Sequence, residues 1–595
     1  MIRKLLVAAA LAVLALLAPL ALAQPQQPAF DLVIQAPDGL RQLLESHLEL
    51  GRYRQVEDLD DAEIARLIVL AEKDARELLA TQGYFSPEVR IAREPGPRPR
   101  LVVTVEPGQP TVVGAVDLGF EGDIATSTDS DAVRQREGIR AAWELPVGQT
   151  FTQGRWDAAK IDATRRLVAR RYPAGRIGYS LADVDAASRQ ARLGLRLDSG
   201  ALFRLGELRV TGAERYDPLL VERLARLPRG MVYDQEKIVQ AQLRLVGSGY
   251  YESAFLFVDP EADPAAAPVQ VTVREAPLQK VVLGVGFTTD GGPRASVEHT
   301  HNRLPWIGWR AVSKLQVERK NPFAQTEWTA IPDPGGWRWS VLARGEKLDD
   351  DRLVTHTQRL RGGRFQNGDH IDRNWYLQYE RSSVQNPRNV ALTPLDTGDG
   401  AAVTVNYAWT GRYFQGLPHP SGGYGFGFEL GGGITLEGDR QLFQRTVVRG
   451  LGYYPLKAGR VQLRGEAGAV LARGDAKIPA AQLFRTGGDT TVRGYRYLGI
   501  GVPLPGNLVG PGRFMTVGSV EWQRPIERKG RPSDLESTLF VDAGAVADKV
   551  GQLRPRFGVG AGVRWKSPVG PVEGALAYGL KTRKLRVHFT AGFVF

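Results

Sequence analysis

The sequence contains no cysteine among its 595 residues. This absence excludes disulfide bonds, thiolate metal sites and a cysteine nucleophile. The Gly-x-Ser-x-Gly motif of hydrolases and the His-Glu-x-x-His motif of zinc enzymes are also missing, and the seven histidines are scattered. We therefore expect no enzyme, with no catalytic residue, no metal site and no cofactor.

Long apolar runs and concentrated charge are scarce as well. After residue 23 no continuous apolar run reaches the ~20 residues that a membrane-spanning helix needs. The formal net charge of +12 is spread along the chain without a basic block, so nucleic acid is not expected as a partner. If the mature chain enters a bilayer it must do so as a closed β-barrel, because lipid offers no partners to unpaired backbone groups.

Residues 1–23 have the pattern of a signal peptide. Arg3 and Lys4 precede an apolar run that ends in Ala21-Leu22-Ala23, a small-x-small cleavage site. Export is therefore expected, with the mature chain beginning at Gln24; the alternative is an uncleaved anchor. Because residue 24 is not cysteine, a lipid-anchored form is not expected.

The N-terminal half carries one pattern three times, which predicts tandem α+β domains. In each copy an amphipathic helix ends near an aromatic residue and is followed by an alternating strand. The helices are expected around residues 64–79, 156–169 and 236–245, and the strands begin near residues 101, 193 and 269. The predicted domain boundaries are 24–108, 109–202 and 203–277. The pattern resembles the polypeptide-transport-associated (POTRA) domain, and this resemblance implies that the domains bind partner chains through sheet edges; the alternative is that they act as spacers.

From residue 278 to 595 the apolar residues recur with period two, which predicts an all-β transmembrane barrel. On the first strand one face carries Val281, Leu283, Val285 and Phe287. On the last strand Phe589, Phe593 and Phe595 oppose Arg586 and His588. The length allows about sixteen antiparallel strands. A soluble β-sandwich, which also alternates, is the other interpretation.

A segment rich in glycine, arginine and aromatic residues, 484–499, interrupts these strands and carries a recognisable motif. It contains Val492, Arg493, Gly494 and Tyr495, which resemble the Val-Arg-Gly-Tyr/Phe signature of the BamA/TamA outer-membrane superfamily. Phe540, Asp542 and Gly544 resemble the Phe-x-Asp-x-Gly strand motif of the same superfamily. In that superfamily POTRA domains precede the barrel, and the signature loop folds back into it. The aromatic C-terminal strand, with Gly592, Phe593 and Phe595, resembles the assembly signal of outer-membrane barrels.

Within the superfamily the chain is most similar to the TamA branch, because it has room for three POTRA domains. A BamA-type chain would need about five, and a two-partner secretion transporter would have two behind a plugging helix. The resemblance implies an assembly or translocation factor in a Gram-negative outer membrane, with periplasmic POTRA domains. It also implies a TamB-like partner anchored in the inner membrane, unfolded outer-membrane clients, and a lateral seam flanked by Val281, Leu283, Val285 and Phe589. The alternatives are a two-partner secretion pore and, in another class, a passive porin.

The geometry of the strands predicts one side-chain contact, between Arg493 and Asp542. Period two places Asp542 opposite Leu539 and Val541, so its carboxylate points into the lumen. If the loop folds inward, Arg493 can form a partly desolvated ion pair with Asp542. The resemblance implies the same contact.

Overall fold

The computed structural model describes residues 29–56, 59–96, 98–387, 390–416, 419–528, 531–567 and 570–591. The predicted signal peptide and three residues of the predicted assembly signal, Gly592, Phe593 and Phe595, lie outside the described residues. One compact unit runs up to Arg209 and adds Pro228–Ile238 and Phe257–Gln270; the other comprises Val210–Leu227, Val239–Leu256 and Val271–Phe595. In the described part of the chain, no helix combines the length and apolarity needed to cross a membrane.

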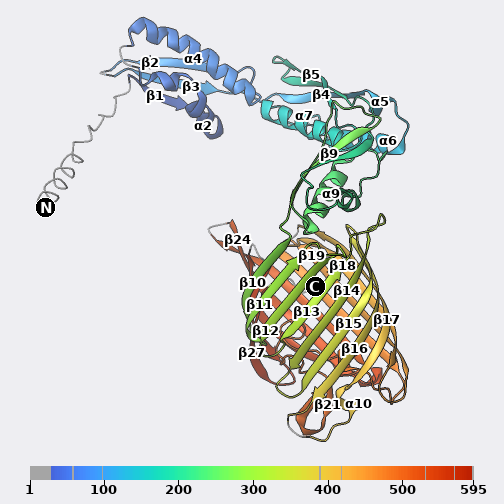
Figure 1. Ribbon diagram of the computed structural model, residues 1–595. Coiled ribbons are helices and arrows are strands. Elements are labelled where there is room, and N and C mark those ends of the chain that lie inside the picture. The colour runs from blue at the N-terminus through green and yellow to red at the C-terminus, as the bar shows by residue number, and fades with distance from the viewer. Residues whose placement is uncertain are drawn as a thin grey trace, which may run out of the picture. The chain divides into compact units, whose positions relative to one another are not determined.

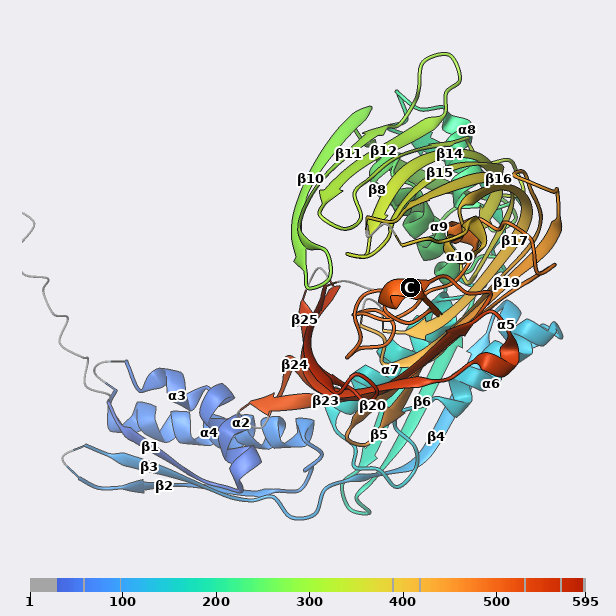
Figure 2. The same cartoon turned by 90° about the horizontal axis from the view of Figure 1, so that it is seen from below.

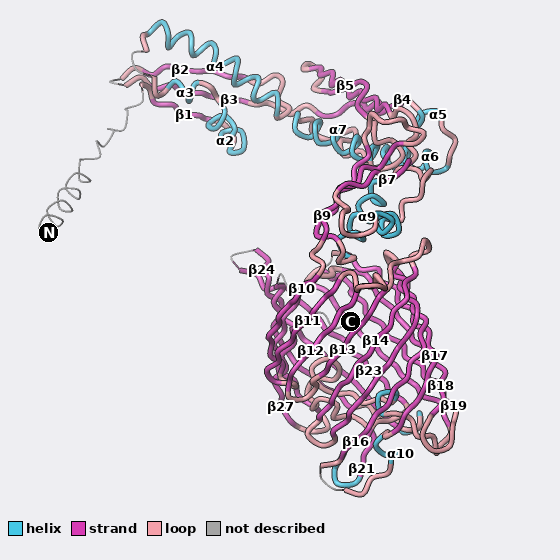
Figure 3. The backbone as a smooth tube through the Cα atoms, viewed as in Figure 1, coloured by secondary structure: helices cyan, strands magenta, loops and turns pink. Residues whose placement is uncertain are grey.

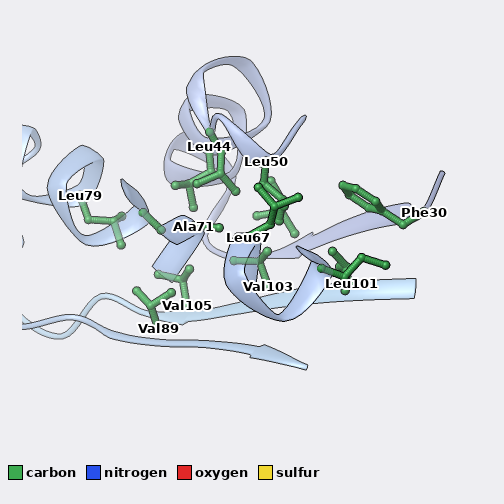
Figure 4. Close-up of a cluster of buried hydrophobic side chains, with 14 residues drawn as sticks. Phe30, Leu44, Leu50, Leu67, Ala71, Leu79, Val89, Leu101, Val103 and Val105 are labelled. Carbon is green, nitrogen blue, oxygen red and sulfur yellow. The ribbon is translucent and has the colours of Figure 1, made fainter. Parts of the chain in front are cut away.

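The first α+β domain packs two longer helices on a three-stranded sheet with strand order β1-β3-β2. Its elements are β1 (Asp31–Gln35), α2 (Asp38–His47), α3 (Leu50–Tyr53), α4 (Asp61–Thr81), β2 (Glu88–Glu94) and β3 (Arg100–Glu106). The predicted helix at 64–79 is α4, which begins where Asp60 accepts a hydrogen bond from the Glu63 amide, 2.7 Å. Leu67, Ala71 and Leu79 of α4 bury one face against Val103 and Leu101 of β3 (Figure 4).

The second α+β domain repeats this arrangement with strand order β4-β6-β5, so β5 is an edge strand. Trp156, Ala163 and Leu167 from one helix pack on Leu193 and Leu195 from the central strand. Its elements are β4 (Val112–Glu121), α5 (Asp123–Thr126), α6 (Ser130–Ala141), α7 (Gln153–Val168), β5 (Arg176–Asp185) and β6 (Gln190–Asp198). The helix predicted at 156–169 is α7.

The third sheet has the order β7-β9-β8 and contributes residues to both compact units. Its elements are β7 (Leu205–Thr211), α8 (Pro218–Ala225), α9 (Gln235–Gly247), β8 (Tyr251–Val258) and β9 (Ala267–Glu275). The helix predicted at 236–245 is α9. All three copies thus have the order β-α-α-β-β, with additional short helices in the first two, which confirms the predicted tandem α+β class.

Sixteen antiparallel strands follow, the number that the length of this segment predicts. Each pairs with the next strand of the same sheet (Figures 1 and 2). They are β10 (Gln279–Thr288), β11 (Gly292–His301), β12 (Arg310–Glu318), β13 (Phe323–Thr329), β14 (Trp337–Asp349), β15 (Val354–Asn367), β16 (Ile371–Gln385), β17 (Gly400–Gln415), β18 (Gly422–Thr435), β19 (Leu442–Leu456), β20 (Gly459–Ala472), β23 (Phe514–Arg528), β24 (Arg531–Ala547), β25 (Arg556–Ser567), β26 (Gly570–Gly579) and β27 (Lys584–Ala591). In this order β20 pairs with β23. Outward residues such as Leu539 and Val541 are exposed, whereas the alternate residues Phe540 and Asp542 are buried.

The connections carry short elements that do not join the barrel sheet. These are α10 (Pro394–Thr397), η1 (Ala480–Gln482), β21 (Val502–Leu504), η2 (Pro505–Asn507), β22 (Leu508–Gly510) and η3 (Val550–Gln552). Four of the six lie in the connection between β20 and β23. Figure 3 shows loop segments enclosed by the barrel strands.

Candidate functional site

The connection between β20 and β23, residues 473–513, folds into the barrel; we refer to it as the lumen loop. Two pairs of mutual backbone hydrogen bonds brace it, between Phe484 and Gly512 (2.9 and 2.8 Å) and between Thr486 and Ile500 (2.9 and 2.8 Å). Phe484, Val492, Tyr495 and Ile500 are buried in one apolar cluster with inward residues of the barrel wall, which include Val447, Val470, Met515 and Val517. Apolar packing as well as hydrogen bonding therefore holds the loop in place.

Arg493, at the centre of this loop, is held by three carboxylates. Its Nε and Nη2 donate to the two oxygens of Asp542 at 2.8 and 3.0 Å, as a bidentate fork, and its backbone amide donates to Asp542 Oδ2 at 3.0 Å. Its Nη1 donates to Glu521 at 2.7 Å and to Glu573 at 2.8 Å. Arg493 is 7 % exposed and Asp542 is 0 % exposed. The structure thus brings together the two residues that the sequence pairs, and adds two acids.

A second arginine, Arg564, extends the contacts of Arg493 into a network of ion pairs. Arg564 Nη2 donates to Glu521 at 2.8 Å and to Glu573 at 2.6 Å, so both glutamates bridge the two guanidinium groups. Ser519 Oγ donates to Asp542 at 2.7 Å. Through these hydrogen bonds two guanidinium groups face three buried carboxylates, so each charge depends on its partners.

Phe540 and two glycines of the barrel wall, Gly544 and Gly558, border the space that Arg493 and its neighbours occupy. The guanidinium carbon lies 3.3 Å from the centroid of the Phe540 ring, a cation–π arrangement. A Cβ atom on Gly544 would lie 2.5 Å from Val492 Cγ2, and one on Gly558 would lie 1.9 Å from the Arg493 carbonyl oxygen. Glycine at these two strand positions lets the loop backbone lie directly on the wall.

The next loop residues reach the last strands of the barrel. Gly494 has φ +89°, and a Cβ there would lie 2.7 Å from the Gly579 amide nitrogen. Tyr495 is buried, and its hydroxyl donates to the Phe557 carbonyl at 3.2 Å and accepts from the Lys581 amide at 3.2 Å. All four residues of the signature therefore contact the barrel wall or lie buried in the loop's apolar cluster.

His588 of β27 joins the lumen loop to the end of the sheet. Its Nε2 accepts a hydrogen bond from the Gly494 amide at 2.8 Å, which leaves Nδ1 as the donor to the Asp489 carboxylate. This tautomer is the neutral one. The Asp489 amide in turn donates to Asp290 Oδ2 at 3.3 Å, in the turn between β10 and β11. Burial, and then the charge of Asp489, raises the pKa of Asp290.

The first and last strands of the sixteen-stranded sheet, β10 and β27, are joined by few interactions within their described residues. Within residues 279–288 and 584–591, as described, β10 and β27 do not pair as a ladder. A hydrogen bond from the Phe589 amide to Thr289 Oγ1, 3.0 Å, joins their ends. We call this junction the seam. The predicted seam residues Val281, Leu283 and Val285 point outward and are 60 %, 75 % and 92 % exposed, and Phe589 is partly exposed on β27.

Sequence reasoning missed several members of this site. Sequence reasoning does not predict Glu521, Ser519, Asp489, Arg564 or Glu573 as members. It places His588 on the charged face of the last strand but predicts no partner for it. The alternation of Val520 and Trp522 around Glu521 was the available signal, because it places that carboxylate inside the barrel. Among the residues described, no three His, Cys, Asp or Glu side chains gather closely enough to hold a metal ion.

Comparisons with known proteins match both halves of the chain. Residues 347–595 match the Omp85 superfamily domain, and residues 36–107 match the POTRA domain classified as TamA domain 1. The outer membrane protein assembly factor BamA of Neisseria meningitidis serogroup B is 21 % identical over 550 residues, which covers 78 % of this chain and 68 % of that protein. The crystal structure of Haemophilus ducreyi BamA lacking POTRA domains 1–3 aligns with TM-score 0.56 at 16 % identity, covering 81 % of this chain and 99 % of that one.

The similarity to the Haemophilus ducreyi structure supports the fold, a barrel preceded by α+β domains. The two domain matches cover part of the barrel and the first α+β domain. An Omp85 superfamily domain that follows a POTRA domain of the TamA type supports placement of the chain in the BamA/TamA superfamily.

Proposed function

We propose that this protein is a TamA-like outer-membrane assembly or translocation factor that inserts or secretes client proteins, autotransporters among them, through the seam. The observation that carries the proposal is the junction of β10 and β27, which lacks a ladder in the described residues and lies beside a buried, charged lumen loop. We assign the protein no covalent chemistry and no cofactor. Its site is the Gram-negative outer membrane, with the three α+β domains in the periplasm.

The mechanism follows from the cost of unpaired backbone groups in lipid. An amide or carbonyl without a partner in the hydrocarbon core costs several kcal/mol, so two facing strand edges without a ladder bind an added strand favourably. A client strand that pairs with β10 satisfies these groups and exposes its own far edge to the next client strand. Backbone pairing of this kind needs no defined client sequence.

The lumen loop favours the function of an assembly factor over that of a passive porin. Residues 473–513 occupy part of the barrel interior and are tied to the wall by the Arg493 network. A diffusion channel needs a water-filled lumen, and a loop packed inside the barrel narrows that lumen. A two-partner secretion pore would also carry such a loop, and the three α+β domains favour the TamA-like function over it.

The proposal is tested in proteoliposomes of the purified full-length protein. An outer-membrane β-barrel client diluted from urea is expected to fold at least about tenfold faster than in protein-free liposomes, because the seam supplies strand partners. The measurement is the electrophoretic band shift of the folded client. No acceleration, together with a large steady current in planar bilayers, would establish a passive pore instead.

The second α+β domain offers a surface for the proposed TamB-like partner. Its edge strand β5 exposes Ile177, Tyr179 and Leu181, the last at 50 %. Both faces of β5 are largely open, and one side of its backbone has no neighbour in the sheet order β4-β6-β5. An extended segment of the partner can add there as a fourth strand, with its apolar side chains on Tyr179 and Leu181.

Leu181→Glu is expected to weaken co-purification of the partner by about tenfold or more, because a charge on the docking edge must be desolvated when a strand pairs with it. Leu70→Glu is the matched control, since Leu70 of α4 is also 50 % exposed but lies on a helix. The measurement is the amount of partner retained on full-length protein extracted in mild detergent. Equal losses in both variants would rule out β5 as the docking edge.

A further inference from the structure

A second cluster of arginines lies inside the barrel, away from the lumen loop network. It lines a cavity of about 550 Å³ at the strand ends that face the α9–β8 connection. Ser248 and Tyr250 form one wall of the cavity, and the inward residues Arg310, Arg338, Arg361 and Tyr376 form the others. We call this cavity the arginine pocket. It has no part in the proposed strand exchange at the seam.

Within the described part of the chain, the guanidinium groups of Arg310, Arg338 and Arg361 form no ion pair with an acid. Arg338 of β14 makes no hydrogen bond or ion pair within the described residues, and Arg310 Nη1 donates to a neutral group, the Ser248 carbonyl at 3.0 Å. Arg361 donates to the neutral Gln378 side chain at 3.0 and 2.7 Å and stacks 4.0 Å from the Tyr376 ring centroid. The Nε atoms of Arg226 and Arg310 are buried and find no hydrogen-bond partner among the residues that the structure describes.

These charges also repel one another. Arg226, which caps α8 in a left-handed conformation with φ +52°, and Arg310 both lie near enough to Arg338 to oppose its charge. Positive groups that are partly removed from water and unpaired are unfavourable unless an anion joins them. The cluster therefore has the electrostatics of an empty anion site rather than of an internal ion-pair network.

Two acids face the cavity but do not neutralise it. Glu327 accepts a hydrogen bond from Ser340 Oγ at 3.0 Å, and Asp372 forms an ion pair with Arg412. Burial raises the pKa of the Tyr250 phenol, so this hydroxyl remains a donor at neutral pH. Of these two acids, only Glu327 lacks a basic partner in the described residues. The four arginines and the Tyr250 hydroxyl therefore outnumber the acidic groups that could neutralise them.

The geometry favours a tetrahedral oxyanion over a carboxylate. Arg226, Arg310 and Arg338 come from three separate elements, the end of α8, β12 and β14, so they approach a ligand from different directions. A phosphate group has three or more acceptor oxygens and nearly two negative charges, and guanidinium forks match its edges. A carboxylate offers two oxygens and one charge, which one fork satisfies.

We propose that the arginine pocket, with Arg226 beside it, binds a phosphate-class oxyanion, either free phosphate or the phosphoryl group of a larger molecule such as a lipid. This inference is independent of the proposed function, because it requires only the cavity and its charges.

The test is calorimetric titration of inorganic phosphate into the full-length protein in non-ionic detergent, at constant ionic strength and neutral pH. We expect saturable binding of one phosphate per chain. Arg338→Gln and Arg310→Gln are each expected to weaken it by about tenfold or more, the usual effect of losing a charge-assisted hydrogen bond. Arg440→Gln is the control, since this exposed arginine between β18 and β19 lies outside the pocket and removes the same charge.

Further arms of the experiment identify the source of the ligand. If sn-glycerol 3-phosphate displaces phosphate, the pocket accepts the phosphoryl headgroup of a lipid; if phosphate binds and the ester does not, the ligand is the free ion. Both results support the proposal. It is overturned if the wild-type protein binds neither, if Arg338→Gln and Arg310→Gln bind phosphate as tightly as Arg440→Gln, or if a glutamate-rich peptide binds more tightly than phosphate and displaces it.

Discussion

Arg493→Ala is expected to destabilise the closed barrel by about 3–5 kcal/mol, the usual cost of leaving a buried charge without its partner. The substitution leaves Asp542, Glu521 and Glu573 with Arg564 as the remaining cation of the network. It also leaves a void beneath the Phe540 ring and releases the loop backbone from Asp542. The measurement is the temperature at which the folded band is lost in heat-modifiable gel electrophoresis, alongside the rate of client folding.

Arg496→Ala is the matched control for this result. Arg496 lies three residues further along the same loop but is exposed, so its removal is expected to cost less than about 0.5 kcal/mol. Arg493→Lys should behave more like alanine than like arginine, because an ammonium group cannot make the bidentate fork to Asp542. Adding Asp542→Asn to Arg493→Ala should recover part of the loss by removing an uncompensated charge. Equal effects at positions 493 and 496 would show that the network does not hold the loop.

Locking the seam is expected to abolish client insertion. The chain contains no native cysteine, so a Thr289→Cys, Phe589→Cys double variant has no competing thiol. The Phe589 amide lies 3.0 Å from Thr289 Oγ1, which places the two Cα atoms within reach of a disulfide. A covalent link between β10 and β27 prevents a client strand from entering between them. Oxidation should reduce the client folding rate at least about tenfold, to the level of protein-free liposomes, and a reductant should restore it.

A cysteine pair at Thr326 and Ala343 controls for the chemistry of oxidation. These residues are direct partners in the β13–β14 ladder, which remains paired whether the seam is open or closed. Oxidation of this pair should leave client folding unchanged. Full activity of the oxidised seam variant would mean that clients do not pass between β10 and β27, and the proposed route would be rejected.

Local periodicity predicted much of the barrel correctly. The alternation around Asp542 identified its inward direction because side chains of a strand alternate between the two faces whatever the strand pairs with. The same argument identified the outward apolar faces of the first and last strands. In the N-terminal half, amphipathic helices at 64–79, 156–169 and 236–245 were predictable because each must bury one stripe on a sheet. The first domain was anticipated least completely, since β1 and α2 are short, at five and ten residues.

The sequence by itself determined the fold class, the tandem α+β organisation, the sixteen-strand barrel and the inward orientation of Asp542. Only the tertiary structure decided which inward groups meet. Glu521, Glu573 and Arg564 converge on Arg493 from strands 28 to 80 residues away. The alternation with period two determines the face of the strand on which a side chain lies. Strand tilt, register and the path of the lumen loop determine its position along the barrel axis and its neighbours. The seam and the arginine pocket likewise arise where distant strands are brought together, so neither has a local signal in the sequence.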